Sequence, residues 1–329
     1  MKITTMLRHT VLAMALTAAG PVLAKTTLQI SLQLPITHHL GQNLEDFKQE
    51  VEAQSDGDIE VRIFPSAQLF KDSEVHQAVT SGAVNMGVLN LTQLAGTIPA
   101  VDVFYVPFMF PTPEKVAAAT SPDSPVRELL DAEILKTGAR PLWWQAYGGV
   151  ALLSKEIPIK RPEDMAGMKV RVFGKTLGEF VRAVGGAPVS IPGSEQFLAY
   201  QRGVVDAGMT GVSAVGPRKL YQVMNNLTVT NHADIEFMTI INEQFWQSLP
   251  DEHKAIITAA ARKVEKQLRE KMQGLEQQAI VDASEKMNVI HLDDDDVTAW
   301  REATQPVLQK FLENSGELGQ KVVDAAQSL

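Results

Sequence analysis

The sequence predicts an α/β fold with two domains. Near its start, alternating polar and apolar residues at 27–32 and 59–64 flank a helical pattern at 40–51. A strand, a helix and a second strand in this order begin a mainly parallel sheet. Residues 252–287 carry one long helical pattern with a narrow apolar stripe. The chain of 329 residues is long enough for two domains of ordinary size.

The first 24 residues have the pattern of a cleavable secretory signal peptide. Lys2 and Arg8 precede an apolar stretch at 11–19, and small residues at 22–24 form a cleavage site. The apolar stretch is too short to span a bilayer comfortably. We therefore expect the mature chain to begin at Lys25 and to work in the periplasm.

Composition narrows the possible partners. The sequence contains no cysteine, which excludes disulfides and a lipid anchor on cysteine. Its formal net charge of −9 argues against nucleic acid as a partner and cannot attract an anion from a distance. An anionic ligand must therefore be held by local positive charge.

Residues 168–173 are predicted to form the central strand of the second half, ending at Gly174. Because side chains alternate along a strand, its apolar residues share one face, while Arg171 and Phe173 share the other. In open α/β sheets, ligands lie beyond the carboxyl ends of the strands. A guanidinium there matches a carboxylate in bidentate geometry, although an ordinary surface salt bridge is the alternative.

The other elements follow from local patterns. We expect a helix at 73–81, a strand at 86–89, core at 101–110, a helix from 113, a strand at 139–145, the start of the second domain at 151, a helix across 219–224 and a strand at 227–230, whereas residues 237–241 alternate less cleanly. Asp293 to Asp296 precede a helix that starts near Val297. Acidic residues are favoured at helix amino termini, so we interpret this run as a cap and not as a metal site.

The sequence contains no catalytic constellation. It lacks a nucleophile elbow, a phosphate-binding glycine loop and histidines at helical metal spacing. His38 and His39 are adjacent, point apart and form a weak metal pair. Glu195 and Asp206 are interpreted as structural. We therefore predict no catalytic residue, no metal and no cofactor.

Short motifs between residues 161 and 208 identify a family. They read RPEDMAGMKVRV at 161–172, GGAPV at 185–189, and IPGSE followed by AYQRGVVDAG between 191 and 208. This order resembles the solute-binding proteins of tripartite ATP-independent periplasmic (TRAP) transporters, including their dicarboxylate-binding (DctP-type) members. The resemblance covers nearly the whole mature chain.

The resemblance implies a two-lobed periplasmic binding protein of type II-like architecture, with mixed sheets and a long helix bracing both lobes. Lobe I would comprise residues 25–148 and about 237–276, and lobe II residues 149–236 and about 277–329. The protein would close by hinge motion over a small organic acid and deliver it to the TRAP membrane permease subunits. We expect a monomer, with a coiled-coil dimer arm as the alternative role of the long helix.

The resemblance also implies the solute-binding residues, which we predict to be Arg171, Thr210, Gln145, Trp144, Asn90, His38 and Phe173. Arg171 would pair with the carboxylate, and Thr210 stands where the family has an asparagine. Asn90 follows a lobe I strand, where a local turn is the alternative. Trp143 and Trp144 point to opposite faces, so we expect one in the core and the other lining the cleft.

Three departures from the family pattern concern the ligand, and Thr210 is the first of them. Gly193 stands where many members carry an aromatic residue, and a second family arginine falls at about Val150. We therefore expect a monocarboxylate with an uncharged or apolar remainder, although keto, sugar and aromatic acids and dicarboxylates all stay open. The alternative functions are a two-lobed receptor for a sensor or another transporter class, and a periplasmic enzyme on the same scaffold.

Overall fold

The structure is a computed structural model that describes residues 25–329; the predicted signal peptide lies outside the described residues. Its strands are β1 (Thr26–Ser31), β2 (Ile59–Phe64), β3 (Met86–Asn90), β4 (Ala139–Ser154), β5 (Lys169–Val172), β6 (Ala187–Ser190), β7 (Ala207–Gly211), β8 (Asn226–Val229), β9 (Asp234–Asn242) and β10 (Asn288–His291).

Helices cover the strands. The α-helices are α1 (His39–Gln54), α2 (Val75–Thr80), α3 (Pro113–Thr120), α4 (Pro125–Leu135), α5 (Lys175–Ala183), α6 (Gln196–Gln201), α7 (Glu243–Ser248), α8 (Asp251–Ser284), α9 (Asp294–Thr304) and α10 (Pro306–Gln327). Short 3₁₀ turns connect them: η1 (Leu91–Leu94), η2 (Pro99–Tyr105), η3 (Pro162–Met165), η4 (Gly193–Glu195), η5 (Val212–Ala214) and η6 (Leu220–Gln222).

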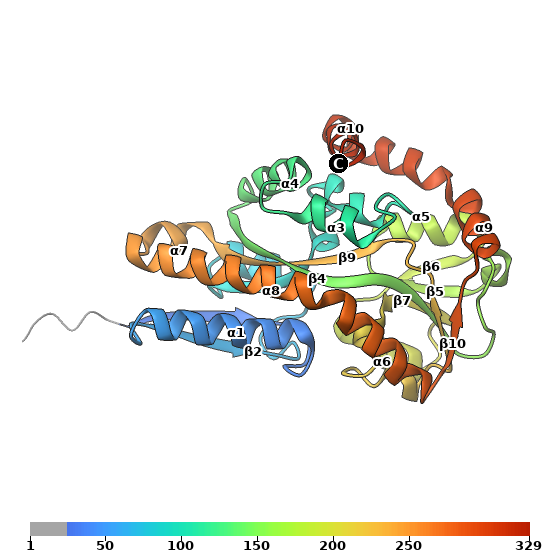
Figure 1. Cartoon of the computed structure of the whole chain (residues 1–329), viewed down its shortest axis with the longest axis horizontal. Coiled ribbons are helices and arrows are strands. Elements are labelled where there is room, and N and C mark those ends of the chain that lie inside the picture. The colour runs from blue at the N-terminus through green and yellow to red at the C-terminus, as the bar shows by residue number, and fades with distance from the viewer. Residues whose placement is uncertain (1–24) are drawn as a thin grey trace, which may run out of the picture.

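Two mixed sheets share strand β4. The lobe I sheet has the order β2-β1-β3-β9-β4, and the lobe II sheet continues as β4-β7-β5-β6, with β8 and β10 at the other edge of β4. Residues 139–149 of β4 pair with β9, and residues 150–154 pair with β7. In Figure 1, β4 and β9 run across the middle of the molecule, between α1 with β2 on one side and β5 to β7 on the other. These strands join the two lobes.

The long helix α8 confirms the prediction of a helix that braces both lobes. Its buried residues recur three or four apart, as in Ile257, Ala260 and Val264, because only one stripe of the helix faces the protein. It packs on α1 and β4 and reaches η5 and β10. Figure 1 shows it lying diagonally across the front of both lobes. A helix of 34 residues spans about 51 Å, which exceeds the width of one small lobe.

The acidic run at 293–296 caps α9, as predicted. The side chain of Asp293 accepts a hydrogen bond from the Asp296 backbone N–H, and Asp296 accepts one from the Asp293 N–H in return. Asp296 also pairs with Lys160 and Arg161, at 3.0 and 3.2 Å. The run therefore fixes the start of α9 against the chain that leads into β5.

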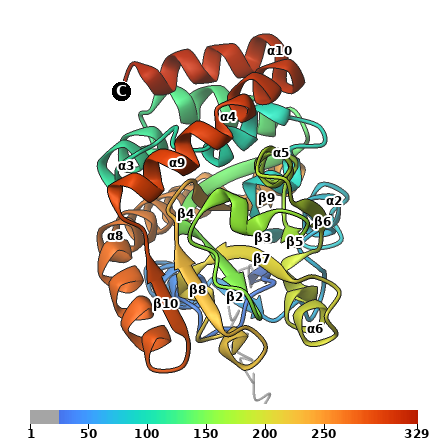
Figure 2. The same cartoon turned by 90° about the vertical axis from the view of Figure 1, so that its right-hand side faces the viewer.

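Three segments differ from the sequence-based expectations or add to them. The helix expected across 219–224 is only the short turn η6, because Lys219 adopts a left-handed φ of 56°. Strand β10 was not predicted; its residues, of which only the two at its ends are exposed, pair with β8. Helix α10 packs on η2 and α4, at the top of Figure 2, as well as on α5.

In residues 25–329, no helix is both long and apolar enough to cross a membrane.

Candidate functional site

A small cavity lies between the lobes, at the carboxyl end of β5. Its lining comes from both lobes: Gln33, Asp72, Asn90, Gln93, Tyr147, Arg171, Phe173, Gly193, Thr210, Arg218, Ile235 and Phe237. Its volume is about 20 Å³, enough for roughly one water molecule. A solute of several heavy atoms therefore enters only when the lobes or their side chains move apart.

Arg171 lies in this cavity with 3% of its surface exposed. Its Nε donates to the Ile191 carbonyl at 2.9 Å, and its Nη1 donates to the Met209 carbonyl at 2.6 Å. The guanidinium carbon lies 4.8 Å from the centre of the Phe173 ring. Burial lowers the pKa of Arg171 from its ordinary value, yet an arginine in a protein stays protonated. Neutral groups thus hold a buried cation at the cavity.

Arg218 supplies a second guanidinium, which the sequence analysis missed. Its Nη1 donates to Gln196 Oε1 at 2.9 Å, and its Nη2 lies 3.3 Å from Gln33 Oε1. The position of the second family arginine, Val150, is a fully buried residue of β4, as its apolar side chain requires. The expectation of a monocarboxylate assumed a single cation in the cleft, and that premise is wrong.

Gly193 leaves the space that the Arg218 side chain uses. A Cβ on Gly193 would lie 3.0 Å from Arg218 Nη2 and 2.5 Å from Gln33 Oε1. Contacts of this length force the neighbouring groups to shift. A larger residue at position 193 would therefore require the ends of the Gln33 and Arg218 side chains to shift from their observed places.

Asn90, Thr210 and Phe173 line the cavity together with Arg171, where the resemblance placed them. The Asn90 amide oxygen accepts from the Thr92 backbone N–H at 3.0 Å and from the Tyr105 hydroxyl at 2.7 Å. These bonds occupy the oxygen and leave the NH₂ group as the donor that Asn90 can offer. Thr210 offers a hydroxyl from β7, and Phe173 offers an apolar ring.

Trp144 and Gln145 do not line the cavity, in contrast to the prediction. Trp144 is fully buried, and its Nε1 donates to Asp131 at 2.9 Å. Gln145 is also fully buried and donates to Asn43 Oδ1 at 2.8 Å. Trp143 likewise packs in the core and donates to Asn43 at 3.0 Å. Helices cover both faces of β4 here, so neither tryptophan faces the cleft.

His38 lies behind the cavity wall and not in the cavity lining. It is fully buried, and its Nδ1 accepts from the Leu40 backbone N–H at 3.1 Å, which caps α1. Its ring stacks on Tyr147 with centroids 5.0 Å apart, and Tyr147 lines the cavity. Burial lowers the pKa of His38 well below its ordinary value, so the ring is neutral. His38 thus supports the wall and adds no positive charge.

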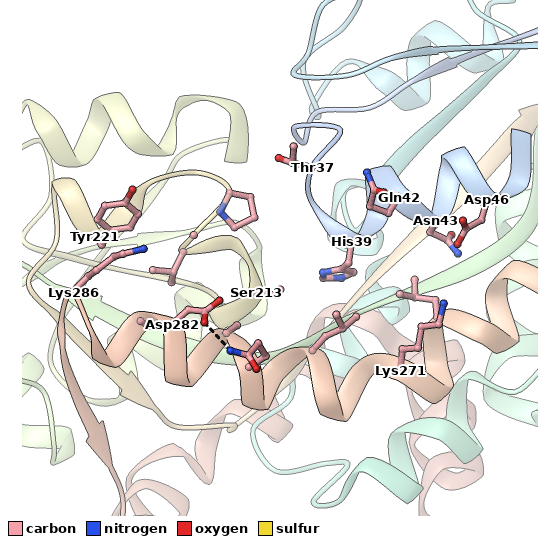
Figure 3. A pocket seen from close by; sticks show the side chains of 18 residues that line it. Thr37, His39, Gln42, Asn43, Asp46, Ser213, Tyr221, Lys271, Asp282 and Lys286 are labelled. Atoms are coloured by element: carbon pink, nitrogen blue, oxygen red, sulfur yellow. Dashed lines mark hydrogen bonds between the residues drawn. The ribbon is translucent and has the colours of Figure 1, made fainter.

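A larger groove, of about 450 Å³, lies on the other side of the paired histidines. Figure 3 shows α8 as its floor, with His39 and Gln42 on one side and Tyr221 on the other. Its charged lining residues are Asp46, Lys271, Asp282 and Lys286, which balance one another. Burial lowers the pKa of His39 to about 4, so this residue adds no charge at neutral pH. The small cavity with two guanidiniums is therefore the stronger candidate for an anion site.

Hydrogen bonds join the lobes around the cavity. Asp72 of lobe I accepts from the Ser194 hydroxyl of lobe II at 2.9 Å. Asp102 of lobe I accepts from the Thr176 backbone N–H, at the start of α5, at 3.2 Å. Both acidic groups therefore meet the amino-terminal end of a lobe II helix or turn, where partial positive charge favours an anion.

A pair of α/β lobes joined by shared strands, with a buried arginine between them, defines the class of periplasmic solute-binding proteins. The model of the DctP family, described as bacterial extracellular solute-binding protein, family 7, matches residues 30–315. The chain belongs to this family. It is a TRAP-type periplasmic solute-binding protein and not an enzyme, which confirms the predicted family, fold class, general function and location.

Comparisons with known proteins agree with this family assignment. The chain is 29% identical to the C4-dicarboxylate-binding periplasmic protein DctP of Shewanella loihica over 299 residues, 87% of this chain and 84% of the relative. It is 28% identical to the sialic acid-binding protein SiaP of Vibrio cholerae over 311 residues, covering 94% and 95%. A crystal structure of a TRAP solute-binding protein from Sulfurospirillum deleyianum, with bound succinate, matches with a TM-score of 0.86 and 25% identity, covering 93% and 99%.

Proposed function

We propose that the protein captures a small organic carboxylate in the cavity at Arg171 and delivers it to the membrane permease subunits of a TRAP transporter. The observation that carries this proposal is the buried guanidinium, which is fixed by two backbone carbonyls. Arg171 uses two of its five N–H donors on these carbonyls. The others are available to a ligand carboxylate.

The binding free energy expected from a pair of Arg171 with a ligand carboxylate is large enough for a solute receptor. Each hydrogen bond to a charged group contributes about 1.5–3 kcal/mol. Two such bonds in parallel would supply a large part of the roughly 8 kcal/mol that a micromolar dissociation constant requires. Because the guanidinium is held in place before binding, little side-chain entropy is lost when the ligand arrives.

The ligands named for related proteins belong to the same chemical class. The Shewanella loihica relative is named for C4-dicarboxylates, the Vibrio cholerae relative for sialic acid, and the Sulfurospirillum deleyianum structure contains succinate. All of these ligands carry a carboxylate. They favour an organic acid as the solute without identifying which one.

Hinge motion would give the ligand access to the cavity. The lobes are joined by β4, the segment before β9, and α8, so rotation about these elements separates Asn90 on lobe I from Arg171 on lobe II. We propose the lobe boundaries expected from the resemblance, 25–148 with about 237–276 for lobe I and 149–236 with about 277–329 for lobe II. The packing of α10 on α4 and η2 favours moving this helix to lobe I.

Calorimetry with a panel of carboxylates tests the proposal. The mature chain should bind at least one acid, and Arg171→Gln should weaken that binding at least 100-fold while the protein stays folded. Arg182→Gln is the matched control, because Arg182 is an exposed arginine of the same lobe, paired only with Glu179. Retained affinity in Arg171→Gln would overturn the proposed role of this residue.

Uptake into vesicles tests the transport partner. Vesicles that contain the cognate permease subunits should accumulate the acid only when the binding protein is added. Accumulation without the protein, or none with it, would contradict delivery to the permease. The monomer expectation is checked by light scattering on the same preparation.

A further inference from the structure

We propose that Asp72 fastens the two lobes to each other and thereby sets how long a bound solute stays in the cavity. Asp72 is a positioning residue in this proposal, because it acts on groups of lobe II and not on the solute. The inference rests on the proposed function and adds to it what controls the release of the solute. Its starting observation is that a lobe I carboxylate lines the candidate anion site.

The position of Asp72 is unexpected for an anion site. Asp72 lines the same cavity as Arg171 and Arg218, and only 2% of its surface is exposed. Like charges repel each other more strongly inside a protein than in water, because the effective dielectric constant is lower there. The electrostatic effect of Asp72 on a bound organic anion is therefore unfavourable. A compensating contribution is expected, and the contacts of Asp72 supply one.

Lobe II binds the carboxylate of Asp72. Oδ2 accepts from the Gly193 backbone N–H at 2.9 Å, and Oδ1 accepts from the Ser194 hydroxyl at 2.9 Å and from the Ser194 backbone N–H at 3.5 Å. In residues 25–329, every hydrogen bond of this carboxylate crosses between the lobes. Hydrogen bonds to an ionised group are stronger than those between neutral groups. We call this contact the clasp, and separation of the lobes breaks all of its bonds together.

The segment that carries Asp72 is fixed within lobe I. The side chain of Glu74 accepts from the Lys71 backbone N–H at 3.0 Å, and the Glu74 backbone N–H donates to the Lys71 carbonyl at 2.9 Å. These two bonds close a tight turn around residue 72, directly before α2. Because the turn is held in place by lobe I, little chain entropy is lost when the carboxylate meets lobe II.

An exposed ion pair crosses the same gap and provides a comparison. Lys71 Nζ lies 2.8 Å from Glu195 Oε1, but 53% and 47% of the two side chains are exposed. An ion pair on the surface contributes little, because water and salt screen its charges. We therefore expect the buried carboxylate of Asp72, and not this pair, to hold the lobes together. Glu195→Gln is the matched control, since it removes a carboxylate from the same gap.

Two introduced cysteines make lobe closure measurable. The sequence contains no cysteine, so dyes attach only at the chosen positions. Ala53→Cys in α1 and Gln201→Cys in α6 lie at exposed positions on opposite lobes, which Figure 1 shows. Energy transfer between the dyes reports the fraction of closed protein at equilibrium. In a stopped-flow instrument the same signal gives the association and dissociation rates of the best acid from the calorimetric panel.

Asp72→Asn tests the clasp through these rates. The variant keeps the size of the side chain but offers one acceptor oxygen in place of two. The dissociation rate should rise about 10-fold or more, and 10-fold corresponds to about 1.4 kcal/mol. The association rate should change less than about 3-fold, because the clasp forms after the solute has entered. Glu195→Gln should change both rates less than about 2-fold.

A purely electrostatic role of Asp72 predicts the opposite result. Loss of a negative charge beside the ligand would then strengthen the binding of an anion and would not speed its release. A merely structural role would instead lower the free energy of unfolding in urea and leave the dissociation rate of the folded protein unchanged. The clasp predicts faster release with unfolding close to wild type.

Ser194→Ala tests the same contact from lobe II. It removes the hydroxyl that donates to Asp72 and should raise the dissociation rate about 3-fold. In the Asp72→Asn background the same replacement should change this rate less than about 1.5-fold, because the hydrogen bond is already impaired. Independent effects of the two replacements would contradict the clasp. If Asp72→Asn does not fold, the dissociation rate of Ser194→Ala decides.

The outcomes separate this inference from the function on which it rests. If no acid of the panel binds, the proposed function fails, and the closed fraction of the ligand-free protein then tests the clasp. Asp72→Asn should lower that fraction, and an unchanged fraction would overturn the clasp as well. If acids bind and Asp72→Asn leaves the dissociation rate unchanged or strengthens binding, the function stands and the clasp is overturned.

Discussion

The carboxylate of Asp72 in lobe I accepts a 2.9 Å hydrogen bond from the backbone N–H of Gly193 in lobe II. Gly193 is also the residue whose missing side chain makes room for Arg218. The contact that joins the lobes and the space that admits the second cation therefore depend on one position. We therefore expect lobe closure and the shape of the proposed ligand site to be coupled at this position.

Replacement of Gly193 by alanine should weaken ligand binding without unfolding the protein. The added Cβ would push Gln33 Oε1 and the Arg218 guanidinium from their places, whereas the backbone at Gly193 needs no positive φ. We expect the dissociation constant of the best acid to rise about 10-fold, which corresponds to about 1.4 kcal/mol. Calorimetry gives the affinity, and urea unfolding should differ little from wild type. An unchanged affinity would show that Arg218 adapts freely.

Replacement of Gly148 by alanine should destabilise the protein at the junction of the lobes. Gly148 has a φ of +105° within β4, and a Cβ there would collide with the Glu276 carboxylate. A non-glycine residue in such a conformation costs about 1–3 kcal/mol of the free energy of unfolding. Urea unfolding measures this loss.

Gly274→Ala is the control for Gly148→Ala. Gly274 lies in α8, where an added Cβ meets nothing within 4 Å. This change should stabilise the protein by about 0.5–1 kcal/mol, because alanine is the better helix former. Equal effects of the two substitutions would contradict the strain assigned to Gly148.

Removal of one partner from the buried ion pair of Arg127 and Glu265 should lower the free energy of unfolding of the protein. This pair joins α4 to α8, and only 7% and 8% of the two side chains are exposed. Glu265→Ala leaves a buried guanidinium, which keeps Asp131 as its remaining partner. We expect a loss of about 3 kcal/mol in the free energy of unfolding, measured in urea.

The double replacement Arg127→Met with Glu265→Leu should cost less than Glu265→Ala, because both members of the pair are removed together and Asp131 keeps its hydrogen bond from Trp144. Glu313→Ala, which breaks an exposed pair with Lys310, should cost less than about 1 kcal/mol. A double variant as unstable as the single one would assign the loss to packing and not to charge.

Acid should destabilise the protein partly through His232. Burial lowers the pKa of His232 from 6.5 to about 3, and its Nδ1 lies 2.8 Å from the Thr230 hydroxyl. Between these pH values the unfolded chain binds a proton that the folded protein does not, so stability falls as pH falls below 6.5. At pH 5 this residue should cost about 2 kcal/mol relative to pH 7.

Urea unfolding of wild type and His232→Gln at both pH values measures this contribution. The variant should lose about 2 kcal/mol less than wild type between pH 7 and pH 5. The difference between the two proteins removes the effects of other titrating groups. An identical pH dependence would show that His232 is protonated in the folded state.

The strand that carries Arg171 could be predicted from a local sequence pattern. Apolar and charged residues alternate over 168–172 shortly before Gly174, so the strand and the position of Arg171 near its end followed from this pattern, whereas the role of Arg171 as an anion clamp stays a prediction. The apolar residues of α8, spaced three or four apart, predicted this long helix equally well. Such elements bury one face, and the spacing of apolar residues reports that face directly.

Arg218 could not be predicted, because it lies in an irregular segment between η5 and η6. The next residue, Lys219, has a left-handed backbone, so no periodicity indicates which way these side chains point. An arginine in such a segment looks like any surface cation. Only the fold brings it beside Gly193 and Gln33.

The surroundings of Trp143 and Trp144 could not be predicted from the sequence either. Alternation correctly places Trp143 and Trp144 on opposite faces of β4, but it does not reveal what covers each face. Asn43 of α1 meets Trp143, and Asp131 of α4 meets Trp144. Strand β10 shows the same limit, since its pairing with β8 sets its conformation and its own partly exposed residues do not.

Because β4 gives its first half to one sheet and its second half to the other, neither lobe can be cut out with its sheet complete. Exchanging whole lobes between relatives would sever this strand or leave it with a foreign partner. New ligand preferences are therefore expected to arise in this protein through individual substitutions around an unbroken scaffold, and not through the recombination of halves.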